Sequence, residues 1–114
     1  MPRSTPTLQN AKDFEAVFKK GRGVGQGGLF LKFTQSDDRA PSRFGIVISK
    51  KVSAKAVDRN RKRRLLKEAI RAYSLNIKKG VDAALIVQPS FLAQNLSQTK
   101  ATLEKLFRKA SLFA

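Results

Sequence analysis

The chain has no cysteine and no histidine among its 114 residues, and only eight of them are aspartate or glutamate. Without cysteine there can be no disulfide framework, no thiolate zinc site and no thiol nucleophile. Without histidine, the commonest general base, the Ser-His-Asp triad and every imidazole metal site are excluded as well. The only adjacent carboxylates are Asp37 and Asp38, in a polar segment that reads as a turn. The composition therefore argues against chemistry carried out by the protein's own side chains.

Long apolar runs are missing too. No stretch approaches the roughly 18 consecutive apolar residues of a transmembrane helix, and residues 1–6 lack the apolar core of a signal peptide. We therefore expect a cytoplasmic protein with no membrane partner.

Three glycines, Gly23, Gly25 and Gly28, match the dinucleotide-binding pattern G-x-G-x-x-G in spacing alone. That motif should follow a strand and open a helix, whereas here it follows a helical pattern and precedes a strand. No acidic residue lies about 20 positions further on to hold a ribose. We therefore expect a loop over residues 21–28, with a short strand around residues 22–27 as the alternative, and no small-molecule substrate.

What the chain does have is positive charge. It carries 24 lysines and arginines against its eight acids, which gives a net charge of +16 and a pI near 11.1. Hydrophobic residues make up 41% of the sequence and include eight phenylalanines, enough for a small core and too many for a disordered basic tail. We expect one RNA-binding domain over residues 1–114, with residues 1–7 mobile, because so positive a surface calls for a polyanionic partner.

Apolar periodicity predicts the elements. Residues 29–34 alternate like a half-buried strand, and residues 43–51 do the same, so we expect these two strands to pair as an antiparallel hairpin. The nearly all-apolar run of residues 81–88 predicts a buried strand that ends before Pro89. Helices are expected over residues 8–20, 57–74 and 97–110.

The segment from Lys50 to Arg71 holds ten basic and two acidic side chains, a local net charge of +8. On a helical projection of residues 57–74, the apolar residues share one face, and Arg63, Arg64, Lys67 and Arg71 share the opposite one. A solvated helix face would need more acids for i, i+4 compensation. A phosphate backbone would remove the repulsion and release counterions. This pattern predicts a nucleic-acid-binding helix.

A second pattern is aromatic. Phe14 and Phe18 lie four residues apart on the first predicted helix, and Phe30 shares a strand face with Lys32. These phenylalanines can be core residues, as most are, or they can form a floor on which single-stranded RNA stacks. Composition and spacing leave both readings open.

Taken together, these motifs resemble the bacterial ribonuclease P protein component, in order from about residue 8 to residue 112. The Arg-Asn-Arg helix is the most specific of them. The resemblance rests on Asp13-Phe14 through Val17-Phe18 and Gly21, on residues 45–51 (GIVISKK), on residues 56–64 (AVDRNRKRR) followed by Lys67-Glu68-Ala69, and on residues 106–112 (LFRKASL).

The resemblance implies an α+β sandwich of α-β-β-β-α-β-α order, with one mixed sheet of about four strands and a left-handed β-α-β crossover. It also implies an accessory subunit of an RNA-based endonuclease, which removes the 5′ leader from precursor tRNA. The catalytic RNA would supply the chemistry with bound magnesium, and the protein would have no catalytic residues and no cofactor of its own.

The same resemblance, together with the basic pattern, implies two sets of RNA-contacting residues, one for the leader and one for the catalytic RNA. Lys32 stands where the family often has an aromatic residue, which favours phosphate contact at that position. Leader contacts are expected from Phe14, Phe18, Phe30 and Lys32. Catalytic-RNA contacts are expected from Lys50, Lys51, Arg59, Asn60, Arg61, Arg63, Arg64, Lys67 and Arg71.

Two other functions remain possible from the residues. A ribosomal or other structural RNA-binding protein would share the charge and bind a different RNA. A protein-only nuclease would need clustered acids to hold a metal, whereas the aspartates are scattered along the chain, at Asp13, Asp37, Asp38, Asp58 and Asp82.

Overall fold

Three helices, four strands and one short 3-10 turn make up the part of the chain that this computed structural model describes, residues 11–35, 42–92 and 94–113. The expected mobility of residues 1–7 lies outside that part. The observed order is the α-β-β-β-α-β-α order that the resemblance implied, and the fold is α+β. The elements are α1 (Ala11–Lys20), β1 (Arg22–Gln26), β2 (Leu29–Gln35), β3 (Arg43–Ile48), α2 (Ala56–Tyr73), the 3-10 turn η1 (Ser74–Asn76), β4 (Val81–Val87) and α3 (Leu96–Lys109).

The four strands form one mixed sheet in the order β1-β2-β4-β3. β2 pairs antiparallel with β4, and β3 pairs parallel with β4. The predicted hairpin between residues 29–34 and 43–51 is therefore wrong, because β4 lies between these strands. The reason is burial: in β4 only Asp82 and Ile86 are not fully buried, and a strand apolar on both faces is most stable at the centre of a sheet.

The loop expected over residues 21–28 is also wrong, and the alternative of a short strand is confirmed. β1 pairs antiparallel with β2, and the connecting Gly27 and Gly28 have φ of 58° and 85°. Two successive positive φ angles are typical of the tight turn that matches strand twist in a hairpin. A Cβ on Gly28 would come within 2.3 Å of the Phe91 backbone nitrogen. The glycines that suggested a loop are therefore what allow the turn and its close packing.

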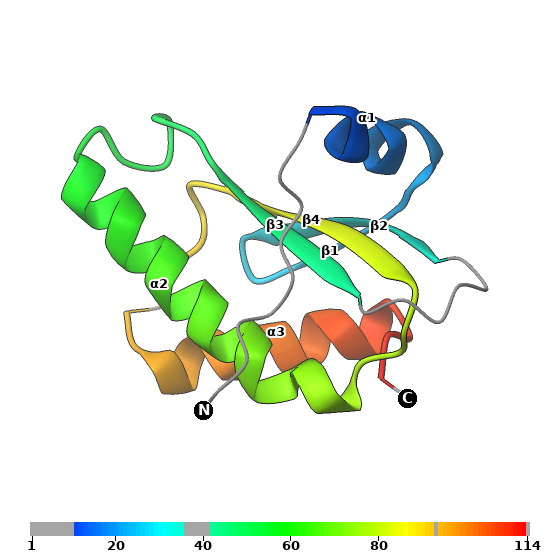
Figure 1. The fold of residues 1–114 in the computed structure, drawn as a ribbon. Helices are drawn as coiled ribbons and strands as arrows, with labels where there is room; N and C mark the ends of the chain where they lie inside the picture. Colours follow the sequence, from blue (N-terminus) through cyan, green and yellow to red (C-terminus); the bar gives the residue numbers. More distant parts are fainter. Residues whose placement is uncertain (1–10, 36–41, 93, 114) are drawn as a thin grey trace, which may run out of the picture.

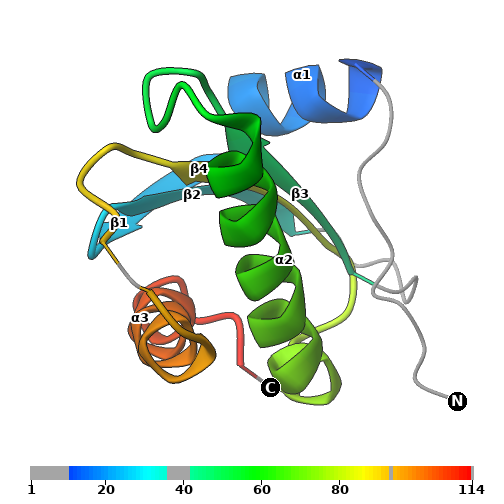
Figure 2. The same ribbon diagram turned by 90° about the vertical axis from the view of Figure 1, so that its left-hand side faces the viewer.

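The sheet separates two layers of helix. α2 and α3 cover one face, and α1 packs across β2 and β4 on the other (Figures 1 and 2). The chain runs from β3 through α2 to the parallel neighbour β4, and the two views together show a left-handed crossover. This is the handedness that the resemblance implied, and it departs from the usual right-handed rule.

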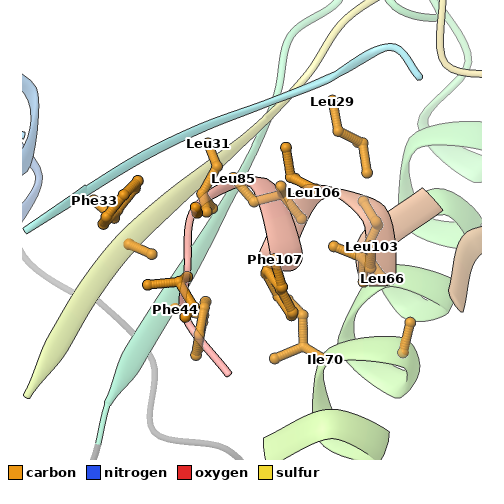
Figure 3. Packing of buried hydrophobic residues seen from close by; sticks show 14 of the residues in the cluster. Leu29, Leu31, Phe33, Phe44, Leu66, Ile70, Leu85, Leu103, Leu106 and Phe107 are labelled. Atoms are coloured by element: carbon orange, nitrogen blue, oxygen red, sulfur yellow. The ribbon is translucent and has the colours of Figure 1, made fainter. Parts of the chain in front are cut away.

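Alternation along β2 decides which side chains meet which layer. Leu29, Leu31 and Phe33 are buried toward α2 and α3, while residues 30, 32 and 34 are half-buried on the α1 side, as predicted. The main core lies between the sheet and α2 and α3, with Phe107 at its centre (Figure 3). A small second cluster on the α1 side joins Val17 to Ala84. In the described residues, no helix has the length and apolar character that crossing a membrane requires.

Candidate nucleic-acid interface

α2 is amphipathic in the way that the projection predicted. Leu66, Ala69 and Ile70 are buried against the core. On the opposite side, Arg64, Lys67 and Arg71 are exposed and Arg63 is half-exposed. We call Arg63, Arg64, Lys67 and Arg71 the basic face of α2. The packing of the apolar stripe holds this face toward solvent.

The members of the basic face differ in their partners. Arg71 donates to the Glu68 carboxylate at 2.7 Å, and Arg63 donates to Oδ1 of Asn60 at 3.3 Å. The side chains of Arg64 and Lys67 have no hydrogen bond or ion pair with any residue in the described ranges. Their charge is therefore uncompensated, and it is open to an external anion.

The first turns of α2 place two more guanidinium groups. Arg59 donates to the Ser53 carbonyl at 2.8 Å, and Arg61 donates to the Gln94 carbonyl at 2.9 Å. A guanidinium has five N–H donors, so each arginine keeps donors for a second acceptor while its position is fixed. Sequence reasoning missed both contacts, since a backbone carbonyl at position 94 leaves no signal at position 61. Lys50 and Lys51 are exposed in the turn that follows β3.

The four residues expected at the leader lie on α1 and on the face of β2 that α1 covers. We call Phe14, Phe18, Phe30 and Lys32 the aromatic surface. The rings of Phe14 and Phe18 are stacked, with centroids 6.3 Å apart and planes at 25°. Phe14 is half-buried against the second cluster, whereas Phe18 is 41% exposed. Phe14 therefore contributes partly to the core, and Phe18 presents much of its ring to solvent.

Phe30 and Lys32 owe their position to small neighbours. Phe30 lies opposite Gly25 on β1, and a Cβ on Gly23 would come within 2.6 Å of the Phe30 ring. The ring therefore lies over the two glycines of β1. Lys32 is flanked in register by Gly23 and Ala84 and has no ion-pair partner among the described side chains. The two glycines therefore accommodate the Phe30 ring, while Ala84 is buried in the cluster with Val17 of α1.

One further pair on this face was not predicted. The Arg43 guanidinium donates to both carboxylate oxygens of Asp82, at 3.0 and 2.8 Å. The pair neutralises a carboxylate that would otherwise repel phosphate beside the aromatic surface. Parallel pairing of β3 with β4 brings these residues together across 39 positions of sequence. No group of three carboxylates in the described ranges could hold a metal ion.

These features define a class of small basic α+β protein, with a cationic helix below a mixed four-stranded sheet and an aromatic surface above it. Residues 1–111 match the family model described as Ribonuclease P. The chain is 33% identical over 108 residues to the ribonuclease P protein component of Synechocystis, covering 95% of this chain and 87% of that protein. It is 36% identical over 108 residues to the component from Microcystis aeruginosa, covering 92% and 90%.

Solved structures agree with these sequence relatives. The Staphylococcus aureus RNase P protein has a TM-score of 0.84 at 24% identity, covering 95% of this chain and 97% of that one, which supports the fold. The Thermotoga maritima RNase P protein has a TM-score of 0.77 at 26% identity, covering 90% and 96%. The chain belongs to the ribonuclease P protein component family.

Proposed function

We propose that this protein is the RNA-binding subunit of the ribonucleoprotein that removes the 5′ leader from precursor tRNA in the cytoplasm. The observation that carries the proposal is the pair of surfaces on opposite faces of one sheet. The first turns and the basic face of α2 would bind the catalytic RNA. The aromatic surface would bind the leader, so that one rigid body joins enzyme RNA and substrate.

Charge supports the role of α2. Arg64 and Lys67 lie one turn apart without an acid between them, and like charges at this spacing destabilise a helix. Phosphates would relieve that repulsion and release condensed counterions. Arg59 and Arg61, already oriented by carbonyl groups, would add charge-assisted hydrogen bonds at the helix N-terminus, where the helix dipole also favours anions.

Ring geometry supports the role of the aromatic surface. Unpaired bases stack on exposed aromatic rings without sequence preference, and both Phe18 and Phe30 have ring area that the protein does not cover. Lys32 lies beside Phe30 on the same face, where it would pair with a leader phosphate. Mature tRNA has no leader, so this surface would distinguish the precursor from the product.

In this proposal the protein binds and positions, and the catalytic RNA cleaves with the magnesium that it holds. We expect purified protein mixed with ribonuclease P RNA at low magnesium to restore cleavage of precursor tRNA at the leader junction, and protein alone to leave the substrate intact. Gel analysis of end-labelled precursor measures both. Cleavage by protein alone that is lost when Asp or Glu residues are replaced would contradict the proposal and favour a protein nuclease. Recovery of ribosomal RNA as the sole RNA bound in cells would favour a structural ribosomal role.

Phe18→Ala tests the aromatic surface. Stacking is worth about 1–3 kcal/mol per base, so we expect the affinity of the reconstituted enzyme for precursor tRNA to fall roughly 5- to 150-fold. Affinity for mature tRNA and the melting temperature should stay at wild-type values, because the side chain is 41% exposed. Equilibrium binding with both tRNAs measures the difference.

The matched control for this variant is Leu75→Ala. Leu75 lies in η1 and is 96% exposed, so its loss should change neither affinity nor stability. An equal effect of Phe18→Ala on precursor and mature tRNA would exclude leader stacking at Phe18. We prefer this variant to one that also removes Phe14, whose ring packs partly on the Val17–Ala84 cluster.

A further inference from the structure

β1 is an edge strand whose outer side has no strand partner. Within the described ranges it pairs with β2 alone, and α1 lies across β2 and β4, away from β1 (Figure 2). Nζ of Lys109 donates to the Gly25 carbonyl at 3.0 Å, so the peptide groups of Gly25 point outward from the sheet. Alternate residues of a strand point the same way, so those of Gly23 do as well. This edge has no side chains on its two glycines to keep a ligand backbone away.

Cations without an ion-pair partner among the described residues line the far side of this edge. Arg22 opens β1 and is exposed, and its side chain has no hydrogen bond or ion pair with any described residue. α3 runs beside β1: a Cβ on Gly27 would touch Thr102, and Lys105 and Lys109 follow on the same stripe of the helix, both exposed. The nearby carboxylate of Glu104 is bound by Arg108 at 2.8 Å. Among the described residues, the edge therefore presents Arg22, Lys105 and Lys109 without a competing acid.

The Phe30 ring connects this edge to the aromatic surface, because it lies over Gly23 and Gly25. A nucleotide stacked on Phe30 has α1 on one side and the edge of β1 on the other. The next phosphates of a strand that leaves Phe30 over β1 would come to Arg22 and Lys109.

We propose that the edge of β1, with Arg22, Lys105 and Lys109, binds the phosphates of leader nucleotides that extend beyond the aromatic surface. The partner is the single-stranded RNA of a long leader, held by charge and not by base recognition. This inference rests on the proposed function of the aromatic surface, and it adds a dependence on leader length that the aromatic surface alone would not give.

The test uses the reconstituted enzyme and two precursor tRNAs, one with a leader of about four nucleotides and one with a leader of about twelve. Both lengths lie within the range of nucleotides that single-strand binding sites usually cover. The variant is Arg22→Gln with Lys109→Gln. Each of the two phosphate contacts to a single strand raises the association constant by about 0.7 log units at 0.1 M salt. We therefore expect roughly 25-fold weaker binding of the long-leader substrate and an unchanged affinity for the short-leader substrate. The charge-matched control, Lys78→Gln with Lys79→Gln in the loop before β4, should leave both affinities unchanged.

Each outcome has a distinct meaning. A loss confined to the long leader supports the β1 edge as a leader site, because any loss of stability from the missing hydrogen bond between Lys109 and Gly25 would act on both substrates alike. An equal loss for both leaders, or weaker assembly with the catalytic RNA, would assign the edge to another part of the particle and overturn the inference. Wild-type affinity of the variant for the long leader would overturn it as well. If wild-type enzyme binds precursor and mature tRNA equally, the proposed function of the aromatic surface itself fails, whatever the variant does.

Discussion

Replacing both Arg64 and Lys67 by glutamine is expected to weaken assembly with ribonuclease P RNA about 60-fold at 0.1 M salt. Each phosphate contact to helical RNA raises the association constant by roughly 0.9 log units at that salt concentration. The reason is that the logarithm of the association constant falls by about 0.9 per contact for each tenfold rise in salt. If the wild-type interface makes about six such contacts, its slope is roughly −5, and the variant's slope should be shallower by about 1.8. Filter binding across a salt series measures both quantities.

The melting temperature distinguishes the variant at Arg64 and Lys67 from a variant in the first turns of α2. Arg64 and Lys67 make no polar contact with the described residues, so their loss should leave the melting temperature unchanged. Arg59→Ala with Arg61→Ala should weaken assembly too, but it also removes the hydrogen bonds to the Ser53 and Gln94 carbonyls, and the melting temperature should fall. An unchanged salt slope in the Arg64 and Lys67 variant would mean that the basic face of α2 is not in contact with the RNA.

Phe107→Ala is expected to destabilise the protein by about 3–5 kcal/mol, the usual cost of emptying a buried aromatic site. The Phe107 side chain is fully buried and meets three rings from different parts of the chain. Its centroid lies 5.8 Å from that of Phe44, 6.4 Å from that of Tyr73 and 5.9 Å from that of Phe113. It therefore joins β3, α2 and the C-terminal segment to α3. Figure 3 shows the Phe44 and Phe107 side chains of this group.

Urea denaturation followed by circular dichroism measures this loss. Phe18→Ala is the matched control, since the same side-chain atoms are removed from a largely exposed position and stability should hardly change. A loss below about 1 kcal/mol for Phe107→Ala would show that the core closes around the missing ring, which is not typical of a site surrounded by rigid aromatic groups. A large loss of folding stability would lower every RNA affinity because part of the protein would be unfolded. The stability of each variant must therefore be measured before any binding defect is interpreted.

Local periodicity was enough to predict much of the fold. The alternation of Leu29, Leu31 and Phe33 and the apolar stripe of α2 depend only on near neighbours, and both are as predicted. Strand order was not predictable in the same way, because β4 lies between β2 and β3 in the sheet. β4 begins at Val81, 33 residues after β3 ends at Ile48. β1 was ambiguous since Val24 is its only apolar residue, and its identity as a strand depends on pairing with β2.

The two candidate sites also differ in how far local sequence predicts them. The basic face of α2 follows from helix geometry alone, and the structure places its four residues together. The aromatic surface joins α1 to β2, and only the motif resemblance brought those segments together before the structure did. The hydrogen bond between Arg61 and Gln94 and the ion pair between Arg43 and Asp82 needed the tertiary fold.

The central position of β4 has a consequence for synthesis on the ribosome. β2 and β3 each depend on β4 for a pairing partner, and the chain emerges from its N-terminal end. Until Val87 has left the exit tunnel, the nascent chain can form the β1-β2 hairpin, but the sheet cannot assemble, and one edge each of β2 and β3 stays without its partner. Such edges are prone to intermolecular pairing. Repulsion among the ten cations between Lys50 and Arg71, which emerge just before β4, would keep neighbouring nascent chains apart during that interval.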